Sequence, residues 1–377
     1  MADIIEYADD LGPLKVIHVH EASVGLKAVL VVDNVAKGPS IGGIRMAPDV
    51  TTEECVRLAR AMTMKNAAAG LPHGGGKVVL QGDPKMPKPQ KAELLRCLAS
   101  ALRTEEDYIF APDMGTDEEC MAWIRDEVGR VVALPREIGG IPLDEIGATG
   151  WGLAQAAEVA ADYCDFELKG ARVAVQGFGA VGRNVSRFLV EKGAVLVAAS
   201  DSRGTVHNPD GLDVQSLAAL KVEGRSLADY AGGTHGCCDD IVDVECDIWI
   251  PAARPDVIND DNVEGLNTKL FLQGANIPAT ETAEARLHEK GILYVPDFIA
   301  NAGGVICAAM EYHGATESAA MDTIKEKVAR NTRLVLERVM ADGISPRQAA
   351  KEMALERVRK AMSFRRFSTF SMGPNYI

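Results

Sequence analysis

The stretch RVAVQGFGAVGRNVSRFLVEKG, residues 172–193, decides the fold of the second half of the chain. A short β-branched run leads into Gly177, Gly179 and Gly182, and a helical pattern follows at once. In this G-x-G-x-x-G spacing the first glycine permits a tight turn, the second lets the backbone approach a pyrophosphate, and the third lets helix and strand pack closely. The free N–H groups at the start of the helix then face the phosphates. The stretch therefore predicts a dinucleotide site at a strand–turn–helix junction.

The segments around this junction also alternate between strand-like and helical patterns. An alanine-rich helical pattern precedes it, and short apolar runs follow it at intervals that leave room for helices. The runs are VLVAAS (195–200), DIWIPAA (247–253), KLFLQGAN (269–276) and ILYVPDF (292–298). Short apolar strands alternating with helices indicate a parallel, doubly wound α/β sheet, the Rossmann arrangement.

An acidic residue stands where such a site meets the adenine ribose. Asp201 follows a predicted strand, roughly twenty residues beyond the last glycine, as the fingerprint requires. Its carboxylate favours NAD, because it would accept a hydrogen bond from the 2′-hydroxyl and repel a phosphate. Ser202 and Arg203 come directly after it and could accommodate that phosphate. The sequence therefore leaves both NAD and NADP open as cofactors.

The first half of the chain reads as mixed α/β structure. Apolar and polar residues alternate in strand-like fashion at its start, and helical periods follow. Thr51 or Thr52 is the expected N-cap of the first long helix, and Gly70 with Pro72 ends it. The expected elements are strands at 14–22, 25–35, 40–47, 77–81 and 107–111, and helices at 51–69, 90–103 and 116–128.

Composition limits the possible partners. The 377 residues include 40 basic and 54 acidic side chains, a formal charge of -14 that disfavours nucleic acid and anionic membranes. The acidic N-terminus lacks a basic leader with an apolar core, and no apolar run approaches membrane-spanning length. We therefore expect a cytoplasmic protein that binds small molecules and copies of itself. Its eight cysteines and seven histidines form no CxxC or HExxH pattern, so no metal site is predicted.

Two lysines suggest chemistry in the first half. Lys77 follows three glycines in GLPHGGGK, and Lys65 stands twelve residues earlier in MTMKNAAAG. A lysine at its usual pKa of about 10.4 is almost fully protonated in the cell. A second cation nearby and exclusion of water lower that pKa, which makes lysine a usable general base. The Leu71-Pro72 turn could bring the two together, but solvated surface lysines are the commoner case. Spacing alone leaves both open.

Seven motifs together resemble one family. GGIRM, RLARAMTMKNAAAGLPHGGGK, APDMGT, GATGWG, VAVQGFGAVG, QGAN and PDFIANAGGV occur in the order found in the glutamate/leucine/phenylalanine/valine dehydrogenases. The resemblance runs from about residue 13 to residue 310. It implies reversible oxidative deamination of an L-amino acid to a 2-oxo acid and ammonia with NAD or NADP, by two domains that close a cleft over the reactants.

The resemblance also implies roles for particular residues. Lys65 would bind the α-carboxylate, Lys77 would activate the water that attacks the imino acid, and Asp113 would exchange protons with the amine. Gly42, Gly43 and Met62 would line the substrate pocket, and Asn276 would serve both substrate and cofactor. The implied cofactor residues are Thr149, Gly177, Phe178, Gly179, Ala180, Val181, Gly182, Asp201, Ser202, Arg203, Ala252, Asn276 and Asn301.

Four pocket positions bear on the substrate. Glutamate-type members carry a lysine where this chain has Ile41 and a serine where it has Ala308. Without them a glutamate side chain would be buried unpaired, at a cost of several kcal/mol. Ala111 and Val305 resemble the leucine/valine type. We therefore expect leucine, valine, isoleucine or a similar apolar substrate.

Two alternatives stay open. Glutamate is the first, since SDSRGTVHNPDGLD and ANIPATETAEARL look more like glutamate-type members. The second is a dinucleotide-binding sensor without turnover, against which the presence of Lys65, Lys77 and Asp113 argues.

The expected division has three parts. Residues 1–134 form the substrate, catalytic and oligomerisation domain, and residues 135–340 form the NAD(P)-binding Rossmann domain. Residues 341–377 supply a C-terminal helix and a tail that return to the first domain. A homo-oligomer is implied, its size open between dimer, hexamer and octamer. The tail SFRRFSTFSMGPNYI reads as an interface or a loose end.

Overall fold

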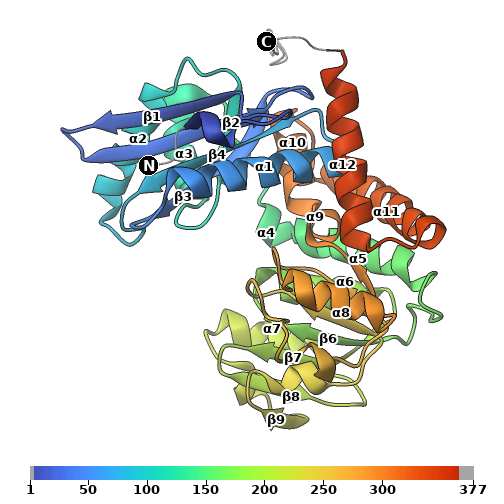
Figure 1. Cartoon of the computed structure of the whole chain (residues 1–377). Helices are drawn as coiled ribbons and strands as arrows, with labels where there is room; N and C mark the ends of the chain where they lie inside the picture. Colours follow the sequence, from blue (N-terminus) through green and yellow to red (C-terminus); the bar gives the residue numbers. More distant parts are fainter. Residues whose placement is uncertain (1–3, 365–377) are drawn as a thin grey trace. The chain divides into compact units, whose positions relative to one another are not determined.

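The computed structural model describes residues 4–364 (Figure 1). They fall into two compact units. The first unit holds residues 4–142, 305–320 and 351–364, and the second holds 143–304 and 321–350. The predicted tail beyond residue 364 lies outside the described residues.

The first unit is built on a five-stranded mixed sheet in the order β1-β2-β4-β3-β5. β1 with β2 and β2 with β4 are antiparallel, whereas β3 is parallel to both β4 and β5. The elements are β1 Lys15–Glu21, β2 Leu26–Asn34, β3 Ser40–Ala47, β4 Gly74–Gln81, β5 Tyr108–Pro112, α1 Thr52–Ala68, α2 Lys88–Ala101, α3 Glu118–Val128, and the short 3-10 helices η1 Ile4–Tyr7 and η2 Arg136–Ile138.

Alternation along the central strands explains how this sheet is covered. Val31 and Val79 pack with α1 residues such as Val56, whereas Leu30 and Leu80 belong to the cluster that includes α2 and α3. Successive side chains of a strand point to opposite faces, so α1 covers one face and α2 with α3 the other. Figure 1 shows α1 lying along this sheet.

The glycine run before Lys77 differs from its predicted structure. The sequence predicted a strand that begins at residue 77, but Gly74, Gly75 and Gly76 are buried residues of β4 itself. A Cβ on Gly74 would overlap the carbonyl oxygen of Asn34, and one on Gly75 would overlap the backbone nitrogen of Thr63. The glycines therefore allow the close approach of β4 to its neighbours from within the strand.

The second unit contains the doubly wound sheet, in the order β12-β11-β10-β6-β7-β8-β9. Five strands are parallel, and β8 and β9 add an antiparallel edge that the sequence did not reveal. The strands are β6 Arg172–Gln176, β7 Val195–Asp201, β8 Gly204–His207, β9 Thr234–Gly236, β10 Ile248–Pro251, β11 Leu270–Leu272 and β12 Leu293–Val295.

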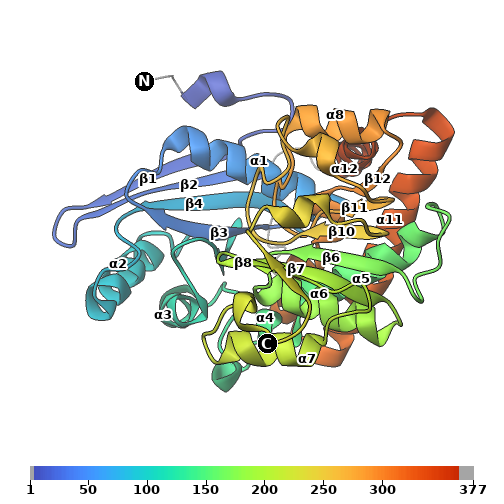
Figure 2. The same cartoon turned by 90° about the horizontal axis from the view of Figure 1, so that it is seen from below.

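Helices accompany this sheet, as Figure 2 shows for α5, α6 and α8. They are α4 Leu143–Ile146, α5 Ala148–Ala161, α6 Ala180–Glu191, α7 Val214–Val222, α8 Glu281–Glu289 and α9 Asp297–Ala300, with 3-10 helices η3 Leu227–Asp229, η4 Asp240–Asp243 and η5 Val263–Gly265. The predicted fold class, a mixed α/β domain plus a Rossmann domain, is confirmed.

Three helices complete the described chain: α10 Gly303–Tyr312, α11 Glu317–Asp342 and α12 Pro346–Met362. Each is shared in sequence between the two units. The predicted division assigned 135–340 to one domain, whereas the compact units place 305–320 with the first unit. In the second part of α12, Arg357 donates to the carbonyl oxygens of Ala67 (3.3 Å) and Ala68 (2.6 Å), which end α1.

Two features are absent from the described residues: a membrane-spanning helix and a cluster of metal ligands. None of the helices in residues 4–364 is long and apolar enough to cross a membrane. Over the same residues, no group of three or more His, Cys, Asp or Glu side chains is placed to hold a metal ion.

Candidate active site

The first unit brings Lys77 and Asp113 into contact. Lys77 lies on β4 with 5% of its surface exposed, and Asp113 directly follows β5. The Lys77 Nζ lies 2.5 Å from the Asp113 Oδ2. Arg45 on β3 donates through Nε to the same oxygen at 3.2 Å, and its Nη1 pairs with Glu54 of α1 at 2.7 Å. Two predicted catalytic residues thus belong to one chain of alternating charges.

These neighbours keep Asp113 ionised. Burial alone would raise the pKa of its carboxyl group, but the charge and hydrogen bond of Lys77 and the charge of Arg45 hold that pKa below its ordinary value. Thr116 fixes the loop, since its hydroxyl accepts from the Asp113 backbone N–H at 3.0 Å and donates to the Ile44 carbonyl at 2.9 Å. Asp113 is therefore a positioned anion that can accept a proton.

The glycine pair of β3 lies against both residues. A Cβ on Gly42 would overlap the carbonyl oxygen of Gly76, the residue before Lys77. A Cβ on Gly43 would lie 2.7 Å from the Asp113 Cβ. Any side chain at these positions would push apart the strands that bear Lys77 and Asp113, so Gly42 and Gly43 are required by the site's geometry.

Lys65 lies on α1, half-buried, between two residues that join the helix to β4. Thr63 packs on Gly75, and the Asn66 side-chain amide donates to the Gly74 carbonyl at 2.6 Å. These contacts place the backbone at Lys65 next to the strand that carries Lys77. Its role toward a substrate carboxylate stays a prediction.

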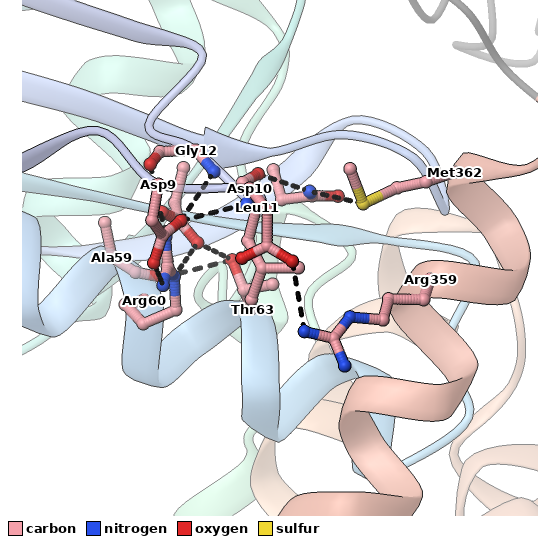
Figure 3. A network of polar contacts seen from close by, with 11 residues as sticks. Asp9, Asp10, Leu11, Gly12, Ala59, Arg60, Thr63, Arg359 and Met362 are labelled. Carbon is pink, nitrogen blue, oxygen red and sulfur yellow. Dashed lines mark hydrogen bonds and ion pairs between the residues drawn. The ribbon is translucent and has the colours of Figure 1, made fainter.

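An ion-pair network that the sequence did not reveal anchors α1 (Figure 3). Arg60 donates through Nε to the fully buried carboxylate of Asp33 on β2 at 2.9 Å, and its Nη1 pairs with Asp9 at 2.6 Å. Thr63 also donates to Asp33, at 2.5 Å. The hydrogen bond from Arg60 lowers the pKa of Asp9 to about 2. The network fixes α1, and with it Lys65, against the sheet.

The predicted pocket residues also belong to the first unit. Ile41 and Ala308 are 2% and 7% exposed, while Ala111, Val305 and Met62 are half-buried. The α10 segment with Val305 and Ala308 is held by Glu311, one turn beyond Ala308. The Glu311 carboxylate accepts from the backbone N–H groups of residues 134 and 141, each at 3.0 Å.

A histidine pair gives α10 a second attachment. The Nε2 atoms of His73 and His313 are 3.0 Å apart, and the Nδ1 of His73 lies 3.1 Å from the Pro39 carbonyl oxygen. Since a carbonyl only accepts, Nδ1 of His73 carries the proton and its Nε2 accepts from His313. Burial lowers the pKa of His73 to about 4. His73 is therefore neutral at ordinary pH.

In the second unit, the three fingerprint glycines have different surroundings. Gly177 has φ +91°, and a Cβ on Gly182 would overlap the Gly177 carbonyl oxygen. Nothing lies within 4 Å of a Cβ on Gly179, at the start of α6. The fold itself needs the first and third glycines, and the second opens onto free space. This cradle fits a dinucleotide pyrophosphate. Ala180 and Val181 begin α6, Phe178 is buried, and Ala252 donates to the Gln176 carbonyl at 2.7 Å.

Asp201 at the end of β7 is already engaged. Its carboxylate accepts from the Lys221 Nζ at 2.8 Å, the Ser226 hydroxyl at 3.0 Å and the Leu227 N–H at 3.0 Å. Burial opposes ionisation, but these hydrogen bonds, led by that from Lys221, lower its pKa to about 2. Ser202 and Arg203 beside it are exposed. Lys221 therefore balances the negative charge of Asp201, the charge that was expected to repel a 2′-phosphate and so to favour NAD.

The remaining predicted cofactor residues lie on neighbouring segments of the second unit. Asn301 donates through its side-chain amide to the Asn276 Oδ1 at 3.0 Å and to the Gly274 carbonyl at 3.3 Å. A Cβ on Gly304 would lie 3.2 Å from the Thr149 hydroxyl oxygen, so the glycines after Asn301 let α10 begin close to Thr149. Asn276, Asn301 and their glycines form one polar corner.

Comparison with known families shows to which protein family the chain that carries these two sites belongs. Residues 14–130 match the model of the Glu/Leu/Phe/Val dehydrogenase dimerisation domain, and residues 139–366 match that of the Glutamate/Leucine/Phenylalanine/Valine dehydrogenase family. The chain belongs to this family. It is therefore an NAD(P)-dependent oxidoreductase of the amino-acid dehydrogenase class.

Individual proteins similar to this amino-acid dehydrogenase are themselves amino-acid dehydrogenases. A glutamate dehydrogenase of Aeropyrum pernix is 37% identical over 88% of this chain and 85% of its own. An NADP(+)-dependent glutamate dehydrogenase of Pyrobaculum calidifontis is 35% identical over the same shares. Among solved structures, a hetero-hexameric glutamate dehydrogenase of Thermus thermophilus in a leucine-bound form has a TM-score of 0.79 and 29% identity, covering 93% of this chain and 88% of its own.

The relatives of this dehydrogenase include both NADP-dependent and NAD-specific enzymes, so the cofactor is NAD or NADP.

The residues of the dehydrogenase that sequence reasoning missed are mostly charged partners: Arg45, Glu54, Arg60, Asp33 and Lys221. GGIRM and the helix before MTMKN contained Arg45 and Arg60, but nothing in the sequence indicated which carboxylates they meet.

Proposed function

We propose that this dehydrogenase deaminates an apolar L-amino acid, such as leucine, valine or isoleucine, reversibly to its 2-oxo acid and ammonia. The observation that supports the proposal is the pair of buried apolar side chains, Ile41 and Ala308, in the unit that holds Lys77 and Asp113. When bound, the dinucleotide supplies the acceptor for the hydride that leaves the substrate Cα.

The chain's own residues handle the amino acid and its protons. Lys65 binds the α-carboxylate, and Lys77 takes a proton from the water that adds to Cα. Asp113 exchanges a proton with the departing amine. The 2.5 Å contact between Lys77 and Asp113 lets a proton pass between the two residues, and Arg45 keeps Asp113 anionic between steps.

Charge favours an apolar side chain in the pocket. Ile41 supplies no cation and Ala308 no hydroxyl, so a substrate carboxylate buried between them would lose hydration without gaining a partner there. Leaving a buried charge unpaired costs several kcal/mol, whereas an apolar side chain gains from burial, about 25 cal/mol per Å².

Glutamate is the second candidate, because the relatives that are 35–37% identical carry the name glutamate dehydrogenase. A panel of L-leucine, L-valine, L-isoleucine and L-glutamate with NAD or NADP at alkaline pH, followed by absorbance of the reduced cofactor, separates the candidates. We expect the highest kcat/KM with a branched aliphatic substrate. A higher value for glutamate would overturn the proposal, and silence with every substrate would favour a non-catalytic sensor.

Specificity variants sharpen this test. Ile41→Lys combined with Ala308→Ser supplies a cation and a hydroxyl, so kcat/KM for glutamate should rise at least about tenfold, equivalent to about 1.4 kcal/mol, while that for leucine falls. Ile41→Leu is the matched control, since it keeps volume and polarity and should leave the preference unchanged. An unaltered preference in the double variant would show that these positions do not face the substrate side chain.

Assembly and domain roles are also proposals. The match to the family's dimerisation domain supports a homo-oligomer. The Thermus relative assembles as a hetero-hexamer, which supports assembly but not identity of the subunits. We propose that the first unit binds the amino acid and the second the dinucleotide, and that the protein is cytoplasmic.

A further inference from the structure

A buried arginine lies at the start of α12, in the second unit. The side chain of Arg347 is 16% exposed, and its guanidinium meets both carboxylate oxygens of Glu284, at 2.5 and 2.6 Å. It also donates to the Gln273 Oε1 at 2.9 Å and pairs with the Asp297 Oδ1 at 3.1 Å. Arg347 thus joins α8, the residue after β11 and the start of α9 around one cation.

Two of these partners belong to the segments that carry the asparagines. Gln273 stands three residues before Asn276 in QGAN, and Asp297 stands four before Asn301 in PDFIAN. The Asp297 backbone N–H donates to the Gln273 Oε1 at 2.9 Å. Arg347 therefore contacts both the QGAN and the PDFIAN segments at the point where a hydrogen bond already joins them.

Asp297 in turn contacts the polar corner formed by Asn276, Asn301 and their glycines. Its Oδ2 accepts from the Ile277 N–H at 2.9 Å, and its carbonyl accepts from the Asn301 N–H at 2.8 Å. Ile277 has φ +48°, a left-handed conformation that is rare for a β-branched residue, and its side chain is 58% exposed. Since the exposed side chain offers little packing, hydrogen bonds hold this turn: the Ile277 N–H, next to Asn276 in the chain, donates to Asp297, and the Ile277 carbonyl oxygen accepts from the Asp256 N–H at 2.9 Å.

We infer that Arg347 is a positioning residue for the reaction: by holding Asp297 and Gln273 it fixes Asn276 and Asn301 in the geometry that binds the dinucleotide and the substrate. What the two asparagines do rests on the proposed function, while their placement by Arg347 is a matter of the contacts above. Without the guanidinium, the buried carboxylates of Glu284 and Asp297 would lose the cation that they share.

If Arg347 served stability alone, the loss of either carboxylate partner would have the same effect on activity. The two carboxylates therefore provide a matched comparison. Glu284 and Asp297 both pair with Arg347, and their side chains are 5% and 9% exposed. Only Asp297 contacts the Ile277 turn, whereas Glu284 reaches the neighbouring segment through Gln273, whose Nε2 donates to the Glu284 Oε1 at 2.7 Å, a bond that a glutamine at position 284 can still accept. Glu284→Gln and Asp297→Asn therefore remove the same charge from the same cluster, but only the second weakens the hydrogen bond that holds the turn.

The test measures melting temperature, the dissociation constant of the reduced dinucleotide by fluorescence, and kcat/KM, in the full-length wild type, Arg347→Lys, Asp297→Asn and Glu284→Gln. We expect lower melting temperatures in all three variants. We expect kcat/KM to fall about 10- to 100-fold in Arg347→Lys and Asp297→Asn, as misplacement of a binding group does, and less than about threefold in Glu284→Gln. Equal losses in the two carboxylate variants, or full activity in Arg347→Lys, would overturn the inference.

A double-mutant cycle tests the link directly. If Arg347 acts through the asparagines, Arg347→Lys should cost less than about threefold in an Asn301→Ala background. An undiminished loss would overturn the inference. A wild type that oxidised no amino acid would refute the proposed function instead. The inference would then depend on dinucleotide binding, which Arg347→Lys must weaken at least about fivefold and Glu284→Gln must not.

Discussion

The two candidate sites use different parts of the polypeptide. In the first unit the working groups are charged side chains, Lys77 and Asp113, brought together by close-packed strands and balanced by Arg45. In the second unit the candidate phosphate cradle is backbone, shaped by three glycines of which the fold itself requires the first and third. Substitutions in the first site should therefore remove chemistry and spare the fold, whereas in the second each glycine separates folding from binding in its own way.

The largest effect is expected at Lys77. Lys77→Met keeps most of the apolar volume but removes the proton-transfer group, so kcat should fall about 10²- to 10⁴-fold. Arg45 still pairs with Asp113, and the melting temperature should change little. Lys88→Met is the control, because Lys88 is 75% exposed and its ion pair is with a surface carboxylate, that of Glu119. A Lys77→Met enzyme with more than a tenth of wild-type kcat would contradict the assignment.

The glycines of the cradle should give opposite results. In Gly182→Ala the new Cβ overlaps the Gly177 carbonyl oxygen, so the backbone must shift, at about 1–3 kcal/mol of unfolding free energy. In Gly179→Ala the methyl group meets nothing within 4 Å. Its melting temperature should equal that of wild type, while the dissociation constant of NAD(P)H rises about tenfold or more, because the methyl stands where the pyrophosphate approaches. Unchanged affinity in Gly179→Ala would place the dinucleotide elsewhere.

A smaller effect is expected at Lys221, where the second unit does use charge. Lys221→Ala leaves Asp201 ionised, held by Ser226 and Leu227, but without a compensating cation. The carboxylate then repels a 2′-phosphate more strongly, so the ratio of kcat/KM with NADP to that with NAD should fall about tenfold, or about 1.4 kcal/mol. A ratio that rises, or stays the same, would mean that the ribose does not meet this end of β7.

The contrast between the units also explains what the sequence could predict. The cradle was predictable because its glycines, strand and helix are neighbours in the chain, and local sterics dictate their order. The pairing of Arg60 with Asp33, or of Arg347 with Glu284 and Asp297, joins residues 27 to 63 positions apart through tertiary packing, and no local pattern encodes it. The predicted strand omitted Gly74–Gly76 for the same reason, since the crowding around these glycines comes from β2 and α1.

The last expected effect concerns stability rather than activity, at the His73–His313 contact in the unit that depends on ionised side chains. Because the folded-state pKa of His73, about 4, lies below the unfolded value of about 6.5, the unfolded chain binds the proton more readily. Stability from this site is complete above pH 6.5 and is lost as pH falls from 6.5 to 4, by up to a few kcal/mol. Asp9 and Asp201, with pKa values of about 2, weaken only below about pH 4, outside this window.

Urea unfolding at several pH values between 7 and 4 tests this. His73→Asn retains an amide that can donate to the Pro39 carbonyl but does not titrate, so the decline of its unfolding free energy with falling pH should be shallower than that of wild type. The exposed His18→Asn, on β1, should follow wild type. The substitution bears on the comparison between the sites, because His73 directly precedes the glycines of β4 and His313 ends the segment that carries Ala308. Parallel pH curves for wild type and His73→Asn would show that this contact carries no proton-linked stability, and the first site would then depend on its ion pairs alone.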